Sequence, residues 1–376
     1  KRLMKMEKVY FFDLKEKDCL FIYEKFLSTL FNRIRQIQRK ASDDYLTSEF
    51  FSSSPEEIVR RYWDSAKDLY NANPLHYDPQ NEELASAYLI CRFVNSGINT
   101  RYSKYYKKFL NANWDAYRKY MEKTDFSEQE QRGWGKHIVH SFNTLNHQKI
   151  LERYSSCTSE EEKVRMMLAD LKENYLRNEP NGNIKKNFDY GPQKLLSKIC
   201  KTILSACIFI EDQGGALAYL RKIEDTINDN KLSDLEKTNK LSKELGRNIS
   251  GYKKALPRDF FKDMGYEIFA KPDEHTIETL GNLFLEVPYP KDGTSENKTC
   301  DIDEVVSSIF IKMAEILSLS GLKTTAFKLD KIVWLLKSGH YYLHYRGNGK
   351  DFRWSENEFK EFCEDLLRSL RHSEYR

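Results

Sequence analysis

Two lysines and an aspartate lie close together in the sequence, and these residue types could act together on a sugar next to a phosphate. Lys253 and Lys254 follow Gly251, and Asp273 comes 20 positions after Lys253 and 19 after Lys254. A glycine between two helices can adopt a positive φ, which lets the next helix present its first N–H groups to an anion. The positive end of a helix also orients a carboxylate placed there. A structural interpretation stays open, in which Gly251 is only a turn, the lysines are solvated and Asp273 only caps a helix.

Helices are predicted on both sides of these residues, and they would position them. Residues 233–245 form a polar amphipathic segment, and the apolar segment 260–266 contains Gly265, a suitable helix-ending residue. Pro272 and Asp273 are typical of a helix start. The expected arrangement is a helix, a basic turn, a second helix and then a carboxylate at the start of a third helix.

The same patterns extend along the chain and predict an all-α protein. Only 16 Gly and 9 Pro in 376 residues favour helices joined by short loops. Further helices are predicted over residues 21–40, 55–70, 82–94, 102–123, 127–151, 159–175, 194–210, 216–228, 302–319, 325–336 and 354–370. The one candidate for paired strands is 341–345 with 352–354, around a Gly-Asn-Gly turn.

The densest cluster of turn-forming residues in the first half of the chain, at 176–193, predicts a domain boundary. We therefore expect a helical N-terminal domain over residues 1–180 and a helical C-terminal domain over residues 190–376. The net charge of +4, from 61 basic and 57 acidic residues, does not by itself indicate a nucleic-acid partner. A basic face would have to be local.

Other common site types are not predicted. Seven cysteines stand singly, which favours reduced thiols in a cytoplasmic protein, and Cys200 and Cys207 are expected in the core on one helix face. No apolar run has the length of a membrane span. His137 and His140 share a helix face, but no carboxylate or cysteine joins them at metal-site spacing, so no metal is expected. No Walker loop or dinucleotide fingerprint occurs, and no cofactor is predicted.

A basic and aromatic segment at residues 99–123 has seven basic and two acidic residues. Its interleaved tyrosines and lysines, among them Lys104, Lys107 and Lys108, could contact a nucleic-acid backbone while an exposed base stacks on a ring. A solvated helix face with tyrosines packed beneath it is the alternative.

The residues from Gly251 onward resemble the helix-hairpin-helix DNA glycosylases of base excision repair, the HhH-GPD superfamily. The resemblance rests on Gly251-x-Lys253-x-Ala255, an apolar helix, and Lys271-Pro272-Asp273-Glu274-His275-Thr276 at the family's spacing. It covers about residues 190–345, and the segment 329–339 looks like that of a divergent bacterial branch. The usual hairpin Gly-Val-Gly is Ile249-Ser250-Gly251 here, and the four-cysteine iron–sulfur pattern of some members is absent.

The resemblance implies an HhH-GPD-like C-terminal domain and a DNA glycosylase that cleaves the N-glycosidic bond of a damaged or modified base flipped from duplex DNA. It implies that Asp273 is the catalytic carboxylate, and that Lys253 or Lys254 is the nucleophile if the enzyme also cleaves the strand. Gly251 and Tyr252 would contact DNA phosphates. The residues that could line a base pocket, each of them also a possible core residue, are Tyr252, Phe260, His275, Trp334, Tyr341 and Tyr342.

Two other functions stay open. One is a hydrolase that acts on the N-glycosidic bond of a free modified nucleoside, which the missing hairpin glycine and the modest net charge would suit. The other is a helical protein that binds DNA or another partner without catalysis.

Overall fold

The computed structural model describes residues 15–41, 45–97, 145–178, 188–253, 255–284, 302–346 and 352–373. These residues form 15 α-helices and one short 3-10 helix, and no β-strand occurs among them. The prediction of an all-α protein is confirmed. An isolated antiparallel bridge joins Leu46 to Tyr345.

The contacts within the chain divide it into two compact units, which we describe one at a time. Unit 1 comprises residues 1–68 and 265–376, and unit 2 comprises residues 69–264. Each unit takes residues from both of the predicted domains, 1–180 and 190–376. The division into those two domains stays a prediction.

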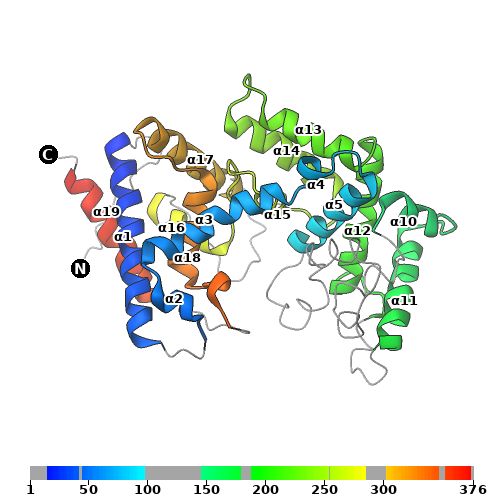
Figure 1. Cartoon of the computed structure of the whole chain (residues 1–376), viewed down its shortest axis with the longest axis horizontal. Coiled ribbons are helices and arrows are strands. Elements are labelled where there is room, and N and C mark those ends of the chain that lie inside the picture. Colours follow the sequence, from blue (N-terminus) through cyan, green and yellow to red (C-terminus); the bar gives the residue numbers. More distant parts are fainter. Residues whose placement is uncertain are drawn as a thin grey trace, which may run out of the picture. The chain divides into compact units, whose positions relative to one another are not determined.

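Unit 1 is built from the first and the last helices of the chain (Figure 1). Its elements are α1 (Glu16–Lys40), α2 (Ser48–Ser52), the first part of α3 (Pro55–Asn71), α16 (Glu274–Phe284), α17 (Ile302–Leu319), α18 (Ala326–Ser338), the 3-10 helix η4 (Tyr342–His344) and α19 (Glu356–Ser373). α1 packs against α17, α18 and α19, and α18 also packs against α16. The buried side chains of α18 therefore lie at the centre of this unit.

Local sequence signals explain where two helices of unit 1 begin or end. Before α3, the N–H of Ser54 donates to the Glu57 carboxylate (2.8 Å) and the N–H of Glu57 donates to the Ser54 hydroxyl (3.2 Å). This reciprocal pair is a capping box, and it confirms the predicted helix start at Pro55. Gly339 ends α18 with a φ of 60°, a left-handed conformation that glycine adopts without strain.

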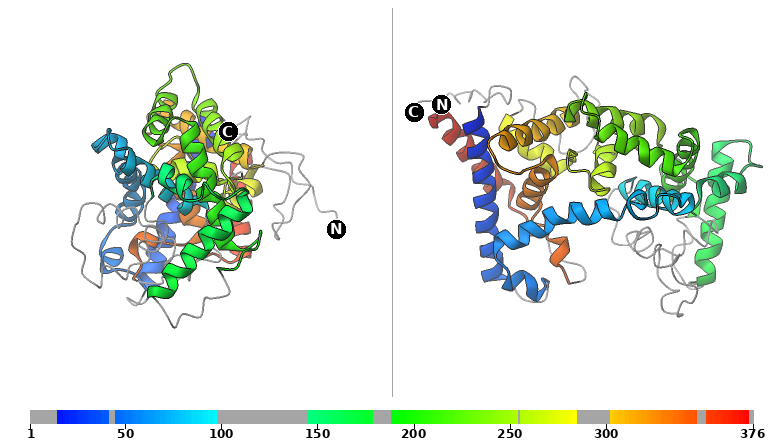
Figure 2. Two further views of the ribbon diagram at one scale, coloured as in Figure 1. Left: turned by 90° about the vertical axis from the view of Figure 1, so that its right-hand side faces the viewer. Right: turned by 45° about the horizontal axis from the view of Figure 1, so that its top comes forward.

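Unit 2 is arranged around the apolar helix α12 (Leu195–Asp212), and Figure 2 gives two further views of its helices. The other elements are α4 (Pro74–Tyr77), α5 (Glu82–Gly97), α10 (His147–Arg153), α11 (Glu160–Asn178), α13 (Ala216–Ile227), α14 (Asp234–Asn248) and α15 (Ala255–Asp263). α12 packs against α5, α10 and α11. Cys200 and Cys207 are fully buried on α12, as predicted, and burial raises the pKa of both thiols.

One helix start in unit 2 depends on a residue that is distant in sequence. Gly215 precedes α13 with a φ of 109° and has no side chain to cap the helix. The carboxylate of Glu82 takes this role: its two oxygens accept hydrogen bonds from the N–H groups of Ala216 and Leu217. A Cβ on residue 215 would lie 2.8 Å from Glu82 Oε1 and would displace this carboxylate, and the φ of 109° itself favours glycine.

The predicted pair of strands at 341–345 and 352–354 is wrong. Residues 342–344 form the helix η4, Tyr345 pairs with Leu46, and the N–H of Phe352 donates to the carbonyl of Gly339 (3.1 Å). The rings of Tyr341 and His344 both pack on Phe50, which a strand with alternating faces would not allow. The predicted helix 102–123 lies outside the described residues, as does the part of the predicted helix 127–151 that precedes residue 145.

No single helix in the described part of the chain is long and apolar enough to cross a membrane. The pair α12 and α13, bent by 77°, meets the criteria of length and composition only when both helices are counted together.

Candidate active site

Asp273 stands at the start of α16, where its side chain caps the helix. Oδ1 accepts hydrogen bonds from the N–H groups of His275 (3.0 Å) and Thr276 (3.1 Å), and the Asp273 carbonyl accepts from the N–H of Ile277 (2.8 Å). Among the described residues none donates a hydrogen bond to Oδ2. The carboxylate is half-buried, so one oxygen is fixed by the helix and the other is open to a substrate or water.

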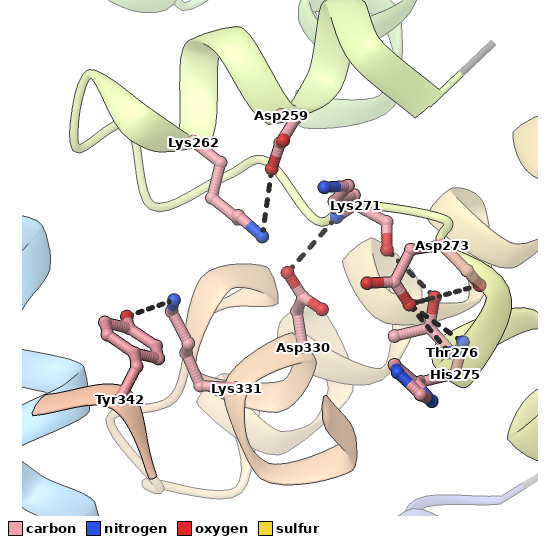
Figure 3. Close-up of polar contacts among 9 residues, drawn as sticks. All are labelled: Asp259, Lys262, Lys271, Asp273, His275, Thr276, Asp330, Lys331 and Tyr342. Carbon is pink, nitrogen blue, oxygen red and sulfur yellow. Dashed lines mark hydrogen bonds and ion pairs between the residues drawn. The ribbon is translucent and has the colours of Figure 1, made fainter. Parts of the chain in front are cut away.

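The turn that leads into α16 is held by a second carboxylate (Figure 3). The N–H of Lys271 donates to Oδ2 of Asp330 on α18 (3.2 Å), and Asp330 is 1% exposed. The hydroxyl of Thr276 donates to the carbonyl of Lys271 (2.9 Å). The N–H and the carbonyl of Lys271 are thus both held by hydrogen bonds. These bonds fix the backbone conformation just before Asp273.

A cluster of rings begins two residues after Asp273. The ring of His275 lies 6.4 Å from that of Trp334, and Trp334 lies 5.8 Å from both His340 and Tyr342. His340 lies 4.8 Å from Tyr345. We call these five residues the ring cluster. The ring of Tyr342 is 41% exposed, and the other four are half-buried, so the cluster lies at the surface of unit 1.

His275 links the carboxylate to the ring cluster. Its N–H donates to Asp273 and its ring faces Trp334, while its Nδ1 is buried and has no hydrogen-bond partner in the part of the chain that the structure describes. Burial lowers the pKa of His275, and the nearby charge of Asp273 opposes that shift. A neutral imidazole is the form that this environment favours.

Tyr341 and Phe260 were predicted pocket residues, and both lie in cores. Tyr341 is fully buried against Phe50 in unit 1, with ring centroids 5.2 Å apart. Phe260, also fully buried, stacks on Phe93 in unit 2 at 4.4 Å. The ring cluster thus includes the predicted pocket residues His275, Trp334 and Tyr342, whereas Tyr252, Phe260 and Tyr341 are fully buried outside it.

The predicted hairpin forms in unit 2, between α14 and α15. Gly251 has the expected positive φ of 83°. The hydroxyl of Thr202 donates to the carbonyl of Ser250 (2.9 Å), and the N–H of Ser250 donates to the hydroxyl of Ser205 (2.9 Å). Two side chains of α12 therefore hold the turn in place.

Residues next to Gly251 differ in exposure. Tyr252 is fully buried, its hydroxyl donates to the carbonyl of Phe93 (2.8 Å) and its N–H donates to the carbonyl of Ile249 (3.1 Å), so neither group is open to a phosphate in this structure. Lys253 is exposed at the turn before α15. Lys253 belongs to unit 2 and Asp273 to unit 1, so the expected meeting of the two groups stays a prediction.

Some predicted site residues fall outside the described residues: Lys104, Lys107, Lys108 and Lys254. Their roles stay predictions. In the part of the chain that the structure does describe, no group of three His, Cys, Asp or Glu side chains is placed to hold a metal ion.

Two residues of this site were not predicted as site residues: Asp330 and Tyr345. Asp330 stands in the segment 329–339 that carries part of the family resemblance, which could have drawn attention to it. The role of Asp330 had no local signal, because its partner Lys271 is 59 positions away.

Comparison with protein-family models, with curated proteins and with solved structures finds no match for this chain.

Proposed function

We propose that this protein is a DNA glycosylase that cleaves the N-glycosidic bond of a damaged or modified base flipped from DNA, with Asp273 as its catalytic carboxylate. One observation carries the proposal. The carboxylate of Asp273 is oriented by two backbone N–H groups that both bind Oδ1, which leaves Oδ2 open, and a surface cluster of rings begins two residues away at His275.

The chemistry of the bond suits this arrangement. Breaking an N-glycosidic bond builds positive charge on the sugar, and a fixed carboxylate stabilises that charge without having to reorganise. The same group can take a proton from the attacking water, and general base catalysis of this kind is typically worth about 10²–10⁴-fold in rate. Asp273 would act through Oδ2 in both roles.

The ring cluster would receive the base. Extruding a base from the stack costs a few kcal/mol, and stacking on aromatic side chains offsets part of that cost. Trp334 and Tyr342 offer ring surface, and the half-buried ring of His275 packs against Trp334.

The remaining site residues complete the proposal for an HhH-GPD-like enzyme. The exposed turn at Gly251 would contact a phosphate through its backbone N–H, and Tyr252 would hold that turn from beneath. If the enzyme also cleaves the strand, the neutral amine of Lys253 or Lys254 would attack C1′ of the sugar and displace the base, and opening of the sugar ring would then give the Schiff base. Lys104, Lys107 and Lys108 would add contacts to the DNA backbone.

The first experiment is a substrate screen. The full chain is incubated with duplexes that each carry a different damaged or modified base, and abasic sites are then revealed by strand breakage in alkali. We expect abasic sites from at least one duplex, and their absence from every duplex would reject the glycosylase.

Borohydride trapping tests the lysine role separately. A covalent protein–DNA product that forms with the native chain and is lost in Lys253→Ala or in Lys254→Ala would identify the nucleophile. Trapping that survives in both variants would exclude both lysines.

The alternative is a helical protein that binds DNA without catalysis. The observation that favours it is that both of the N–H groups bound by Asp273 belong to the first turn of α16, as in any helix cap. Binding to DNA with no base release, in both the native chain and Asp273→Asn, would support this alternative.

A further inference from the structure

Most side chains of α18 are buried, and those that are partly exposed are either lysine or tryptophan. Its buried side chains are Ala326, Phe327, Leu329, Asp330, Ile332, Val333, Leu335, Leu336 and Ser338. The four others are three lysines and one tryptophan, Lys328, Lys331, Trp334 and Lys337, at every third position. These four side chains form one partly exposed line of cationic and aromatic residues along an otherwise buried helix.

All three of these lysines lie over aromatic rings of neighbouring elements, and Lys337 Nζ is 4.0 Å from the ring centre of Phe359, which is buried on α19. Lys328 Nζ is 5.9 Å from the ring centre of Trp63 on α3, and Lys331 Nζ is 5.3 Å from that of Tyr342 on η4. Lys331 Nζ also lies 3.0 Å from the Tyr342 hydroxyl (Figure 3). Lys328 and Lys331 are neighbours one turn apart on the helix, so the two pairs form adjacent copies of the same arrangement.

The charge of these two lysines is not neutralised within the described part of the chain. Lys328 donates to the carbonyl of Lys323 (3.3 Å) and Lys331 contacts the Tyr342 hydroxyl, and neither forms an ion pair with a carboxylate there. Lys337 provides the contrast: it pairs with Glu278 (3.3 Å), and its side chain is only 10% exposed. Positive charge is therefore left open at the first two positions of the line.

We propose that Lys328 with Trp63 and Lys331 with Tyr342 form a binding surface for single-stranded nucleic acid. Aromatic rings stack on unpaired bases, and adjacent cations bind the phosphates between them. A lysine stem is flexible, so the ammonium can move from the ring face to a phosphate when a base arrives. In a duplex both faces of each base are covered by its neighbours, so these rings would select unpaired nucleotides.

The repetition favours a polymer over a free nucleoside. A single nucleoside would need one ring, and it carries no phosphate for two unneutralised lysines. Two ring–lysine pairs one helical turn apart match a strand in which base and phosphate repeat. In its bearing on catalysis this inference rests on the proposed function, since the surface would hold the unpaired nucleotides beside a flipped base. Binding itself requires no bond cleavage.

The test uses the full chain and a fluorescent oligothymidylate strand of about 16 nucleotides without any lesion, with the matching duplex and thymidine monophosphate as competitors. We expect the strand to bind more tightly than both competitors. The double variant Lys328→Gln/Lys331→Gln should weaken strand binding about tenfold and reduce the salt slope by about 1.4, because each phosphate contact on a single strand contributes about 0.7.

Matched variants distinguish binding at this surface from a general effect of the protein's positive charge. Lys360→Gln removes one charge from α19, where Lys360 pairs with Glu364, and should leave the affinity unchanged. Tyr342→Leu, at an exposed position, should weaken binding about 5- to 150-fold through lost stacking, whereas Tyr342→Phe keeps the ring and should bind like the native chain.

Tighter binding of the duplex or of the mononucleotide would overturn the inference. An unchanged affinity in the double lysine variant or in Tyr342→Leu would do the same. Base release plays no part in these measurements, so the strand-binding surface and the glycosylase proposal can fail independently.

Discussion

The N–H of Lys271 donates a hydrogen bond to the buried carboxylate of Asp330, 59 positions later in the sequence (3.2 Å). This bond ties the turn before α16 to the central helix of unit 1. Asp273 stands two residues further on, so the position of the proposed catalytic carboxylate depends on a side chain of α18.

Asp330→Ala should lower the free energy of unfolding by about 1–3 kcal/mol, because the Lys271 N–H loses its acceptor in a largely buried place. Asp330→Asn keeps an oxygen that can accept the bond and should cost less. Urea denaturation measures both. A loss below about 0.5 kcal/mol in the alanine variant would show that the bond does not hold the turn.

Asp273→Ala should lower the free energy of unfolding by about 1 kcal/mol, since α16 would lose its cap. Asn is as good a capping residue as Asp, so Asp273→Asn should stay within a few tenths of a kcal/mol of the native chain. Thermal or urea unfolding of the two variants separates capping from charge. Equal losses in both would mean that the carboxylate charge, and not the cap, stabilises the helix.

Glu82→Ala should destabilise unit 2 by about 1–2 kcal/mol, because the first N–H groups of α13 lose both acceptors and the negative charge at a positive helix end. Glu83→Ala is the matched control: among the described residues, the Glu83 side chain forms only an exposed ion pair with Lys149 (3.1 Å), so its loss should cost less than about 0.5 kcal/mol. Similar losses in the two variants, measured by urea unfolding, would argue against the cap.

Because His344 is buried, the free energy of unfolding should fall in mild acid. Burial lowers its pKa to about 4, helped by Arg61 and opposed by Glu49, whereas the unfolded chain has the ordinary value near 6.5. Between these values the unfolded state binds a proton that the folded state does not. Stability from this group is therefore lost as the pH falls from about 6.5 to about 4, by at most about 1.4 kcal/mol per pH unit.

Urea midpoints measured across that pH range test this expectation. His344→Phe keeps a ring beside Phe50 and removes the titrating group, so its stability should fall less steeply with acid than that of the native chain. Parallel pH profiles for the two proteins would contradict the assignment.

Much of the fold could be predicted because its signals are local. The Ser54 and Ser233 capping boxes, the apolar stripe of α12 and the start of α16 at Asp273 depend on residues within one or two helical turns. The positive φ of Gly251 was predictable for the same reason, since it follows from the residue type and its place between two helices.

The parts that were not predicted depend on contacts between distant segments. The cap of α13 comes from Glu82, and the ring cluster joins His275 to Trp334 and to Tyr342. Tyr341 and Tyr342 are adjacent and of the same type, yet one is fully buried and the other is 41% exposed. The 3-10 turn of η4 sends them to different sides, and sequence periodicity does not indicate such a turn.

The rate of base release by Asp273→Asn tests the central claim most directly. The measurement is single-turnover formation of abasic sites on the duplex from which the native chain releases most base, with both proteins at equal concentration. The account predicts that Asp273→Asn, with its helix cap intact, releases base about 10²–10⁴-fold more slowly than the native chain. Release at the native rate by Asp273→Asn would contradict the assignment of Asp273 as the catalytic carboxylate.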